Sequence, residues 1–334
     1  MLFEELTDYF AQAGERTFRA EQVFRWLHSG ARGFGGMTDI PEKLREKLDS
    51  EFFVTAPEII RKQVSRIDGT VKYLWGMRDG AAVESVAMEY SHGNTVCISS
   101  QVGCRMGCAF CASSIGGLAR NLAASEMLDQ VMFSRLDSGK DLSNVVLMGI
   151  GEPLDNFDNV ERFLRLVNHP MGMNVGARHI SVSTCGILEM IDKLAQCDIQ
   201  FTLSVSLHAP DDETRSRLMP INRDSGVDKL LDACARYFAK TGRRVSYEYA
   251  MIDGVNDTLR QAGLLARKLR NTGSHVNLIP LSDVPERALR GSGPERVNAF
   301  CGLLREKGVN CTVRRSLGGD ITASCGQLRR RELR

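Results

Sequence analysis

The sequence predicts an α/β protein, built as a partial or full barrel of six strand–helix repeats that follows a small helical module. The first observation is a series of apolar, β-branched runs after Asn94, which are TVCISS, NVVLMGI, RHISVST, FTLSVSL, RVSYEYAMI and HVNLIPL. The second is that segments suited to helices separate these runs, and strands that alternate with helices pair in parallel. The third is size, because 334 residues with 43% hydrophobic content are ample for one or two domains.

Residues 1–60 are expected to form the helical module. In TFRAEQVFRWLHSG the apolar side chains fall on roughly one helical face. Glycines between Gly30 and Gly36 then interrupt the chain, and TDIPEKLREKL has the pattern of a further helix. Residues 61–94 contain the strand-like stretches VKYLWGM and AAVESVAMEY, and we expect them to connect the module to the barrel.

Residues 95–320 are expected to form the barrel core, and residues 321–334 a C-terminal segment. The helices expected between the strands are SEMLDQVMFSRLDSG, DNVERFLRLVNH, GILEMIDKLAQC, VDKLLDACARYFAKTG and TLRQAGLLARKLRNTG. A seventh strand run, NCTVRRS, follows a last helix near residues 295–307. In such barrels the chemistry sits at the C-terminal ends of the strands. The residues found there are polar, glycine-rich or thiol-bearing: Gly103, Cys104, Gly151, Glu152, Ser183, Thr184, Ser206, Leu207, His208, Asp253 and Ser282.

The composition indicates a cytoplasmic protein without a membrane segment. Charged residues make up 25% of the chain and the net charge is +2, which is ordinary for a soluble protein. No apolar run approaches the roughly 20 residues of a membrane span, and MLFEELTDYF lacks the basic region of a signal peptide. From Glu286 to the end, eleven Lys and Arg stand against five Asp and Glu, a local balance of +6. Such a tail can contact phosphates, or it can be a solvated terminus.

Three of the ten cysteines are clustered in CRMGCAFC, at Cys104, Cys108 and Cys111. Thiols stay reduced in the cytosol, so clustered cysteines there more often bind metal or do chemistry than form disulfides. Structural zinc sites commonly use two CxxC pairs, and this chain has no second one. A [4Fe–4S] cluster held by three thiolates leaves one iron open to a small molecule. The spacing favours the cluster, with zinc and three buried thiols as the alternatives.

The C-x3-C-x2-C spacing after the first barrel strand resembles the radical S-adenosylmethionine (SAM) superfamily. MGIGEP, after the second strand, resembles the glycine–glutamate motif of that superfamily. The stretches VCISSQVGC, SIGGLARNL, GEPLDN, SVSTCGI, VSLHAP, RLMPIN, IDGVND, VNLIPL and ASCGQL resemble the RlmN/Cfr family of RNA adenine methyltransferases. The N-terminal FRAEQVFRWLHSGARGFGGMTDIPEKLREKL resembles the accessory domain of the same family. The resemblance covers roughly residues 15–328, and it implies a partial (β/α)6 barrel of the radical SAM type with an RNA-contacting helical domain.

The resemblance also implies roles for individual residues. The cluster ligands would be Cys104, Cys108 and Cys111. The SAM site would be formed by Gly151, Glu152, Ser183, Ser206, Leu207, His208 and Ser282. The family usually has Asn where this chain has Ser282, and the serine side chain is shorter. The catalytic residues would be Cys325, which becomes S-methylated, Cys97 as the second thiol, and Glu84 as the general base. Without the resemblance, Cys97 is interpreted as a buried hydrophobe and Glu84 as a surface residue on a strand.

The reaction that the resemblance implies is methylation of an adenine ring carbon, which is not a nucleophile. The Cys325 thiolate would take a methyl group from one SAM. A radical derived from a second SAM would remove a hydrogen from that methyl group, and the carbon radical would add to the adenine. Glu84 would remove the ring proton, and Cys97 would attack the sulfur of Cys325 and release the RNA. The adenine would have to be flipped or presented from a loop.

The implied target is C2 of an adenosine in 23S ribosomal RNA, at the position equivalent to adenosine 2503, together with adenosine 37 of transfer RNA. Pro153 favours this RlmN-type activity, since Cfr proteins tend to have Ala there. Methylation at C8 of the same ribosomal adenosine is the first alternative, and a non-catalytic, zinc-stabilised RNA-binding module is the second. An electron donor such as flavodoxin or ferredoxin and a monomeric state are also implied.

Overall fold

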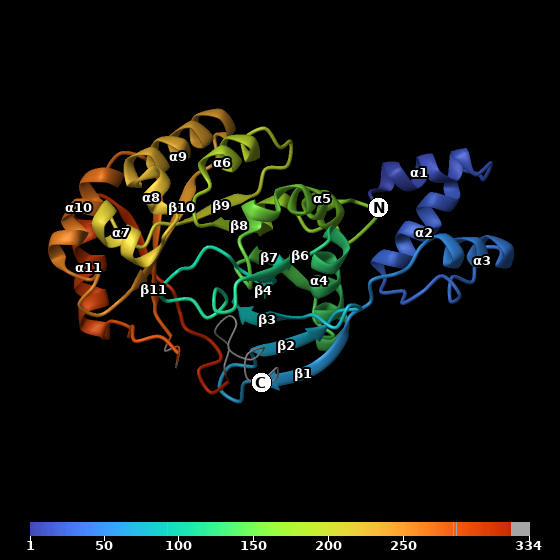
Figure 1. Ribbon diagram of the computed structural model, residues 1–334, viewed down its shortest axis with the longest axis horizontal. Coiled ribbons are helices and arrows are strands. Elements are labelled where there is room, and N and C mark those ends of the chain that lie inside the picture. Colours follow the sequence, from blue (N-terminus) through green and yellow to red (C-terminus); the bar gives the residue numbers. More distant parts are fainter. Residues whose placement is uncertain (92, 283, 285, 322–334) are drawn as a thin grey trace.

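The structure is a computed structural model, and it describes residues 1–91, 93–282, 284 and 286–321. Its centre is a ten-stranded sheet with the order β1-β2-β3-β4-β7-β8-β9-β10-β11-β12 (Figure 1). From β4 onward every neighbouring pair is parallel. The sheet does not close on itself, so the α/β fold is a partial barrel, as the sequence predicted.

All seven predicted runs form these parallel strands. They are β4 (Gly93–Cys97), β7 (Leu142–Leu147), β8 (Ile180–Thr184), β9 (Thr202–Ser206), β10 (Val245–Met251), β11 (His275–Pro280) and β12 (Asn310–Val313). The β10 strand is buried along its whole length, as the middle strands of a covered parallel sheet must be.

Helices follow the strands and cover the outer side of the barrel (Figure 1). They are α4 (Ala124–Ser138), α5 (Phe157–Asn168), α6 (Leu188–Leu194), α9 (Val227–Thr241), α10 (Leu259–Leu269) and α11 (Pro294–Glu306). In α5 the side chains of Val160, Phe163, Leu164 and Val167 are buried. Their spacing of three and four residues places them on one helical face, which packs toward the sheet. No helix within the described ranges is long and apolar enough to span a membrane.

Two further helices, α7 (Asp212–Leu218) and α8 (Asn222–Ser225), lie between β9 and α9. A hairpin of β5 (Gln101–Gly103) and β6 (Leu118–Asn121) forms a second, two-stranded sheet that the sequence analysis did not predict. The residues between these two strands include all three clustered cysteines. The hairpin therefore defines a loop, Cys104–Gly117, which we call the cysteine loop.

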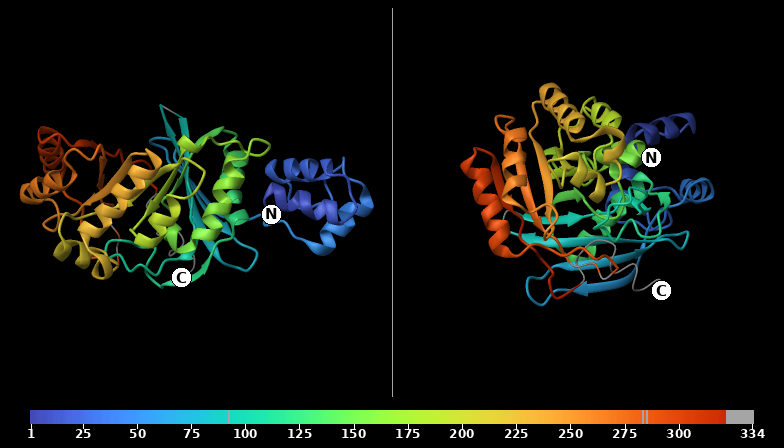
Figure 2. Two further views of the ribbon diagram at one scale, coloured as in Figure 1. Left: turned by 90° about the horizontal axis from the view of Figure 1, so that it is seen from above. Right: turned by 60° about the vertical axis from the view of Figure 1, so that its left-hand side comes forward.

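The N-terminal helices are α1 (Phe3–Gln12), α2 (Phe18–His28) and α3 (Glu42–Glu51). They form a lobe beside the barrel (Figure 2). The helical module ends earlier than residue 60, because β1 (Glu58–Val64) already belongs to the large sheet. The strands β1, β2 (Val71–Gly76) and β3 (Ala82–Tyr90) extend the barrel sheet in antiparallel fashion up to β4.

Two polar contacts join the helical lobe to the barrel. Arg162 of α5 donates to both carboxylate oxygens of Glu5, at 2.6 Å each. Farther along the chain, the Thr55 hydroxyl donates to Asp129 of α4 at 2.5 Å. Asp129 is buried, and burial raises the pKa of its carboxyl to about 7, against the smaller opposing effect of the Thr55 hydrogen bond.

Asp129→Asn is expected to reduce the pH dependence of stability. The folded-state pKa of Asp129 lies above the unfolded value of 3.8, so the folded chain holds a proton that the unfolded chain releases. Wild-type stability should therefore fall as pH rises from about 4 to 7, by on the order of 2–4 kcal/mol from this group. Urea denaturation at pH 5, 6, 7 and 8 measures the difference between the two proteins. An asparagine variant whose stability relative to wild type does not improve toward pH 8 would contradict the assignment.

Candidate active site

A cavity of about 320 Å³ opens at the C-terminal ends of the parallel strands. Nine of the residues predicted from the sequence line it: Cys104, Cys108, Cys111, Gly151, Glu152, Ser183, Ser206, His208 and Ser282. The tenth, Leu207, does not, because its side chain is fully buried in the main hydrophobic core. Its backbone N–H donates to the carbonyl of Glu248 and its carbonyl accepts from Arg215, so Leu207 shapes the site only through its backbone.

The cysteine loop leaves the sheet at Gly103, whose φ of +83° is a left-handed conformation that favours glycine. A Cβ at this position would overlap the carbonyl oxygen of Gly117. That same carbonyl accepts a hydrogen bond from the N–H of Cys104 at 3.0 Å, and the carbonyl of Leu218 accepts one from Ala109 at 2.8 Å. The two ends of the loop are therefore pinned together, and its middle is held against α7.

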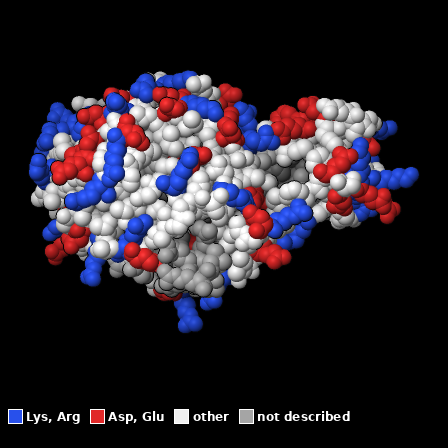
Figure 3. Space-filling model, viewed as in Figure 1, with Lys and Arg blue, Asp and Glu red and all other residues white. Residues whose placement is uncertain are grey.

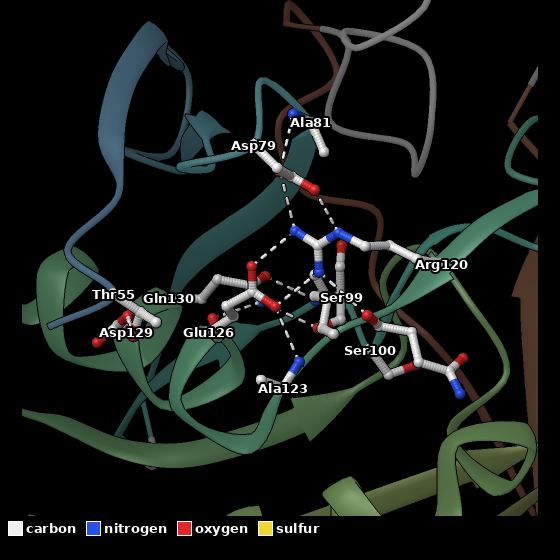
Figure 4. A network of polar contacts seen from close by, with 12 residues as sticks. Thr55, Asp79, Ala81, Ser99, Ser100, Arg120, Ala123, Glu126, Asp129 and Gln130 are labelled. Carbon is white, nitrogen blue, oxygen red and sulfur yellow. Dashed lines mark hydrogen bonds and ion pairs between the residues drawn. The ribbon is translucent and has the colours of Figure 1, made fainter. Parts of the chain in front are cut away.

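A polar network fixes the base of the cysteine loop (Figure 4). Arg120 of β6 donates to both carboxylate oxygens of Glu126, at 2.7 and 2.8 Å, and to Asp79 at 2.6 and 3.1 Å. Glu126 also accepts from the N–H of Ala123 and so caps α4. One arginine thus joins the hairpin, the turn between β2 and β3, and the first turn of α4.

Burial favours the neutral form of two thiols of the cysteine loop, those of Cys104 and Cys108. It raises the pKa of Cys104 to about 11, and it raises the pKa of Cys108 further, with Cys111 and Cys104 as the next contributors. Metal ligation requires thiolates, so loading a metal here must release protons. Among the described residues no three His, Cys, Asp or Glu side chains are gathered to hold a single metal ion. All three thiols instead line the cavity.

Glu152 joins two strand ends at the cavity. It follows Gly151, whose φ is +112° and whose hypothetical Cβ would lie 2.6 Å from the Cβ of Gln101. The carboxylate of Glu152 accepts from the N–H of Cys185 at 2.7 Å and from the N–H of Leu154 at 3.0 Å. Complete burial raises the pKa of Glu152, and these hydrogen bonds oppose the rise. The backbone donors hold the carboxylate at a fixed place on the cavity wall.

His208 is held as a neutral imidazole. Its φ is +55°, and its Nδ1 accepts from the N–H of Ala250 at 2.9 Å, which leaves the proton on Nε2. Burial lowers the pKa of His208 to about 3, with Arg215 as the second cause. Its ring contacts Phe110 of the cysteine loop edge to face, at 4.8 Å between centroids. His208 therefore connects the end of β9 with the loop that carries the thiols.

The buried Arg215, from the stretch preceding RLMPIN, keeps the strand ends in register. Its guanidinium donates to the carbonyls of Cys185 at 2.7 Å and Ser206 at 3.0 Å. The side chain of Asn222 also accepts from it, at 2.8 Å. In IDGVND, Asn256 plays a similar part by donating to the carbonyl of His208 at 2.7 Å. These motifs act by positioning the cavity wall.

A second cavity, of about 210 Å³, contains Cys97. It shares wall residues with the first cavity, namely Met148, Ile279, Pro280, Ser282 and Arg314. Cys97 is 7% exposed and lies opposite Val86 in the ladder between β3 and β4. Leu317 also lines this second cavity. Cys325 lies outside the described residues.

Glu84 lies on the same strand face as Val86 and Cys97, since side chains alternate along β3. It is 3% exposed and forms an ion pair of 2.8 Å with Lys72 of β2, which is fully buried. The interpretation of Glu84 as a surface glutamate is therefore wrong. Glu84 lines neither of the two cavities. Its buried carboxylate lies beside Val86 on the same strand face, and Val86 lines the second cavity.

Two charged residues of the first cavity were missed by the sequence analysis. Glu248 of β10 is 2% exposed, accepts from Asn277 at 3.2 Å, and has no partner for its Oε2 within the described part of the chain. Arg314 follows β12 and donates to the sulfur of Met148 at 3.4 Å. A charged residue within the apolar run RVSYEYAMI was the available signal for Glu248.

The residues present fit an iron–sulfur cluster with SAM. Three thiols line the cavity. Glu248 also lines it, and within the described part of the chain the Oε2 of its carboxylate has no hydrogen-bond partner. A Cβ at position 151 would collide with Gln101 and Ser100, so only glycine lets the chain pass them and place Glu152 on the cavity wall. A partial parallel barrel with a three-cysteine loop after its first strand and a glycine–glutamate pair after its second defines a radical SAM enzyme.

Comparison with known proteins agrees with this class and narrows it. Residues 98–262 match the radical SAM superfamily, and residues 1–54 match the ribosomal RNA large subunit methyltransferase N-terminal domain. A probable dual-specificity RNA methyltransferase RlmN from Caldanaerobacter subterraneus is 48% identical, over 100% of this chain and 98% of the relative. The corresponding protein of Clostridium tetani is 45% identical, over 98% and 94%. The chain belongs to the RlmN family.

Solved structures support the same fold. The crystal structure of a radical SAM methyltransferase from Sphaerobacter thermophilus has a TM-score of 0.92 and 44% identity, covering 98% of this chain and 97% of the other. The SAM-bound SuiB of Streptococcus suis, with a TM-score of 0.50 and 16% identity, covers 66% of this chain and 50% of the other, and it shares the fold alone. The cofactors of the radical SAM superfamily, a [4Fe–4S] cluster and SAM, are therefore those of this chain.

Proposed function

We propose that this chain methylates C2 of an adenosine in 23S ribosomal RNA, at the position equivalent to adenosine 2503, and of adenosine 37 in transfer RNA. The observation that carries the proposal is the pair of adjoining cavities, one with the three clustered thiols and one with Cys97. A radical SAM enzyme that only cleaves SAM has no need of a second thiol beside its cofactor cavity. The relatives named as dual-specificity RNA methyltransferases support RNA as the substrate.

The proposed cofactor site uses the residues on the wall of the first cavity. Cys104, Cys108 and Cys111 would ligate the cluster. Gly151, Glu152, Ser183, Ser206, His208 and Ser282 would surround SAM, with Leu207 contributing backbone only. When bound, the cluster and SAM supply the methyl group and the radical that activates it. The neutral His208, held by Ala250, is suited to a hydrogen bond from Nε2, and the exposed Ser282 stands where both cavities meet.

The proposed methyl carrier is Cys325, and Cys97 would resolve the covalent bond between Cys325 and the RNA. The described residues before Cys325, which end at Ile321, support this arrangement. Gly318 donates to Asp68 at 2.8 Å, and Asp320 accepts from Ser65 at 2.6 Å and from the N–H of Arg66 at 2.8 Å. The segment that leads to Cys325 is therefore anchored beside the second cavity, whose wall includes Leu317.

Glu84 is the proposed base for the adenine ring proton. Its carboxylate forms an ion pair of 2.8 Å with the fully buried Lys72, which holds it in place on the strand. A buried carboxylate that is shielded from water is suited to remove a proton from a ring held at the cavity mouth. Glu84 would have to reach that ring past Val86, so we expect the RNA-bound enzyme to bring the adenine over this strand face.

The RNA itself would contact the helical lobe and the basic C-terminal stretch. On the face shown in Figure 3, Lys and Arg are interspersed with Asp and Glu over the barrel and the lobe. The arginines at 329–331 lie outside the described residues. We place the enzyme in the cytoplasm as a monomer, with reducing electrons from flavodoxin or ferredoxin.

The position of the methyl group distinguishes the proposal from its main alternative. RNA treated with the anaerobically reconstituted enzyme is digested to nucleosides and separated against 2-methyladenosine and 8-methyladenosine standards. We expect 2-methyladenosine alone, because Pro153 resembles the RlmN side of the family. The appearance of 8-methyladenosine would instead identify a Cfr-type enzyme. A colourless protein with one zinc, in place of a brown protein with about four irons, would favour the zinc module.

A further inference from the structure

The loop between β11 and α11 contacts the cysteine loop through Arg287. Its Nη2 donates to the carbonyl of Cys111 at 3.2 Å, to the hydroxyl of Ser114 at 3.0 Å and, more weakly, to the carbonyl of Cys108 at 3.5 Å. The Nε of Arg287 is buried and has no hydrogen-bond acceptor among the described residues. The guanidinium thus packs against the cysteine loop and binds the backbone carbonyls of two cysteines.

Ser114 completes this contact from within the cysteine loop. Its hydroxyl donates to the carbonyls of Cys108 and Cys111, at 3.2 and 3.1 Å, while it accepts from Arg287. The Cys111 carbonyl therefore faces two donors, and the Cys108 carbonyl faces the same two together with the N–H of Cys111. The loop that carries Arg287 also carries Ser282, which lies in the walls of both cavities. The conformation of the cysteine loop is consequently coupled to the loop between β11 and α11.

The contact also places a positive charge beside the cysteine loop. Reduction adds an electron to a cluster, and its potential depends on net charge and on hydrogen bonding around the cluster. Arg215 also acts on Cys108 electrostatically, but it is held by three carbonyl groups and one amide of the barrel wall. Arg287, in contrast, contacts the cysteine loop from the loop that also contains Ser282.

We propose that Arg287 is a positioning residue for the iron–sulfur cluster, resting on the proposed ligation by Cys104, Cys108 and Cys111. Its Nη2 holds the backbone of Cys108 and Cys111 in the conformation that receives the cluster. Its charge stabilises the reduced cluster and so raises the reduction potential. Removing the charge should make the cluster harder to reduce, whereas a lysine should retain the charge but, lacking the rigid planar guanidinium, hold the two carbonyls less firmly.

The test uses the full-length protein with Arg287→Met, Arg287→Lys and the control Arg290→Met. The control removes an arginine charge from the same loop, where Arg290 is exposed. Each protein is reconstituted anaerobically with iron and sulfide, its iron is counted, and its cluster is titrated with dithionite and redox mediators under electron paramagnetic resonance. For Arg287→Met we expect the ratio of reduced to oxidised cluster at the wild-type midpoint to fall about tenfold, which is 59 mV for one electron.

Arg287→Lys should keep the wild-type midpoint and bind less iron, and Arg290→Met should match wild type in both. A wild-type midpoint and full iron content in Arg287→Met would overturn the proposal. If Arg287→Met takes up no cluster, unchanged thermal unfolding of its metal-free form supports the positioning role. A large fall in metal-free unfolding temperature would show a merely structural role and overturn it. Failure of wild type to bind iron would instead refute the ligand assignment.

Discussion

Cys97→Ala is expected to leave a covalent adduct between the enzyme and its RNA as the main product of one turnover. If Cys97 resolves the bond between Cys325 and the adenine, its loss removes the only proposed step that releases the RNA from the enzyme. Cys97 lines the second cavity, and that cavity shares Met148 and Ser282 with the cofactor cavity. Methylated RNA should fall at least about 100-fold, an order of magnitude typical for loss of an essential catalytic group.

The adduct is measured on a denaturing gel with labelled RNA, after anaerobic incubation with SAM and dithionite. Cys234→Ala is the matched control, because Cys234 is also buried but lies in the hydrophobic core on α9. The control should turn over without an adduct. Cys97→Ala combined with Cys325→Ala should also give none. Normal methylation by Cys97→Ala, or an adduct that survives the loss of Cys325, would refute the assigned roles.

Lys72→Met is expected to destabilise the protein by about 3–5 kcal/mol, because it leaves Glu84 as a buried charge without its counterion. The ion pair is 2.8 Å long and both side chains are at most 4% exposed. Adding Glu84→Leu should recover roughly half or more of that loss, since a buried ion pair can often be replaced by apolar residues of similar volume. These two variants therefore distinguish the contribution of the ion pair to stability from the role of Glu84 in catalysis.

Chemical denaturation of the two single variants and the double variant gives the interaction energy as a double-mutant cycle. The methylation assay adds the functional readout. The double variant should be folded and should bind SAM, yet methylate RNA poorly because the base is gone. A double variant no more stable than Lys72→Met would show that the ion pair is not the reason for the loss. Full methylation by the double variant would remove Glu84 from the mechanism.

Much of the fold could be predicted from the sequence because its strands are buried on both faces. Such strands appear as continuous β-branched runs, as in NVVLMGI and FTLSVSL, and each run is followed by an amphipathic helix. The rim of the barrel then follows from topology, which is why the amino-acid sequence alone was enough to assign Cys104, Glu152 and Ser206 to one cavity. Leu207 failed this rule because neighbouring side chains at a strand end point to opposite sides.

The features that could not be predicted depend on long-range pairing. The hairpin of β5 and β6 joins short strands across the whole cysteine loop, and strands of three and four residues have little periodic signal. Glu84 and Lys72 look like a solvated strand face in the sequence, since nothing local shows that this face is covered. Arg287 lies in an irregular loop, and it binds backbone carbonyls such as that of Cys111, 176 positions away, which no side-chain pattern reveals.

Isotope transfer from SAM with a trideuterated methyl group shows whether Cys325 carries the methyl group to the RNA. The enzyme is incubated anaerobically with this SAM, dithionite and unmodified ribosomal RNA, and the nucleosides are analysed by mass spectrometry. If Cys325 carries the methyl group and loses one hydrogen before the carbon joins the ring, the product is 2-methyladenosine with two deuteriums. Three deuteriums in the product would mean that the methyl group was transferred intact, and would contradict the route through Cys325 and Cys97.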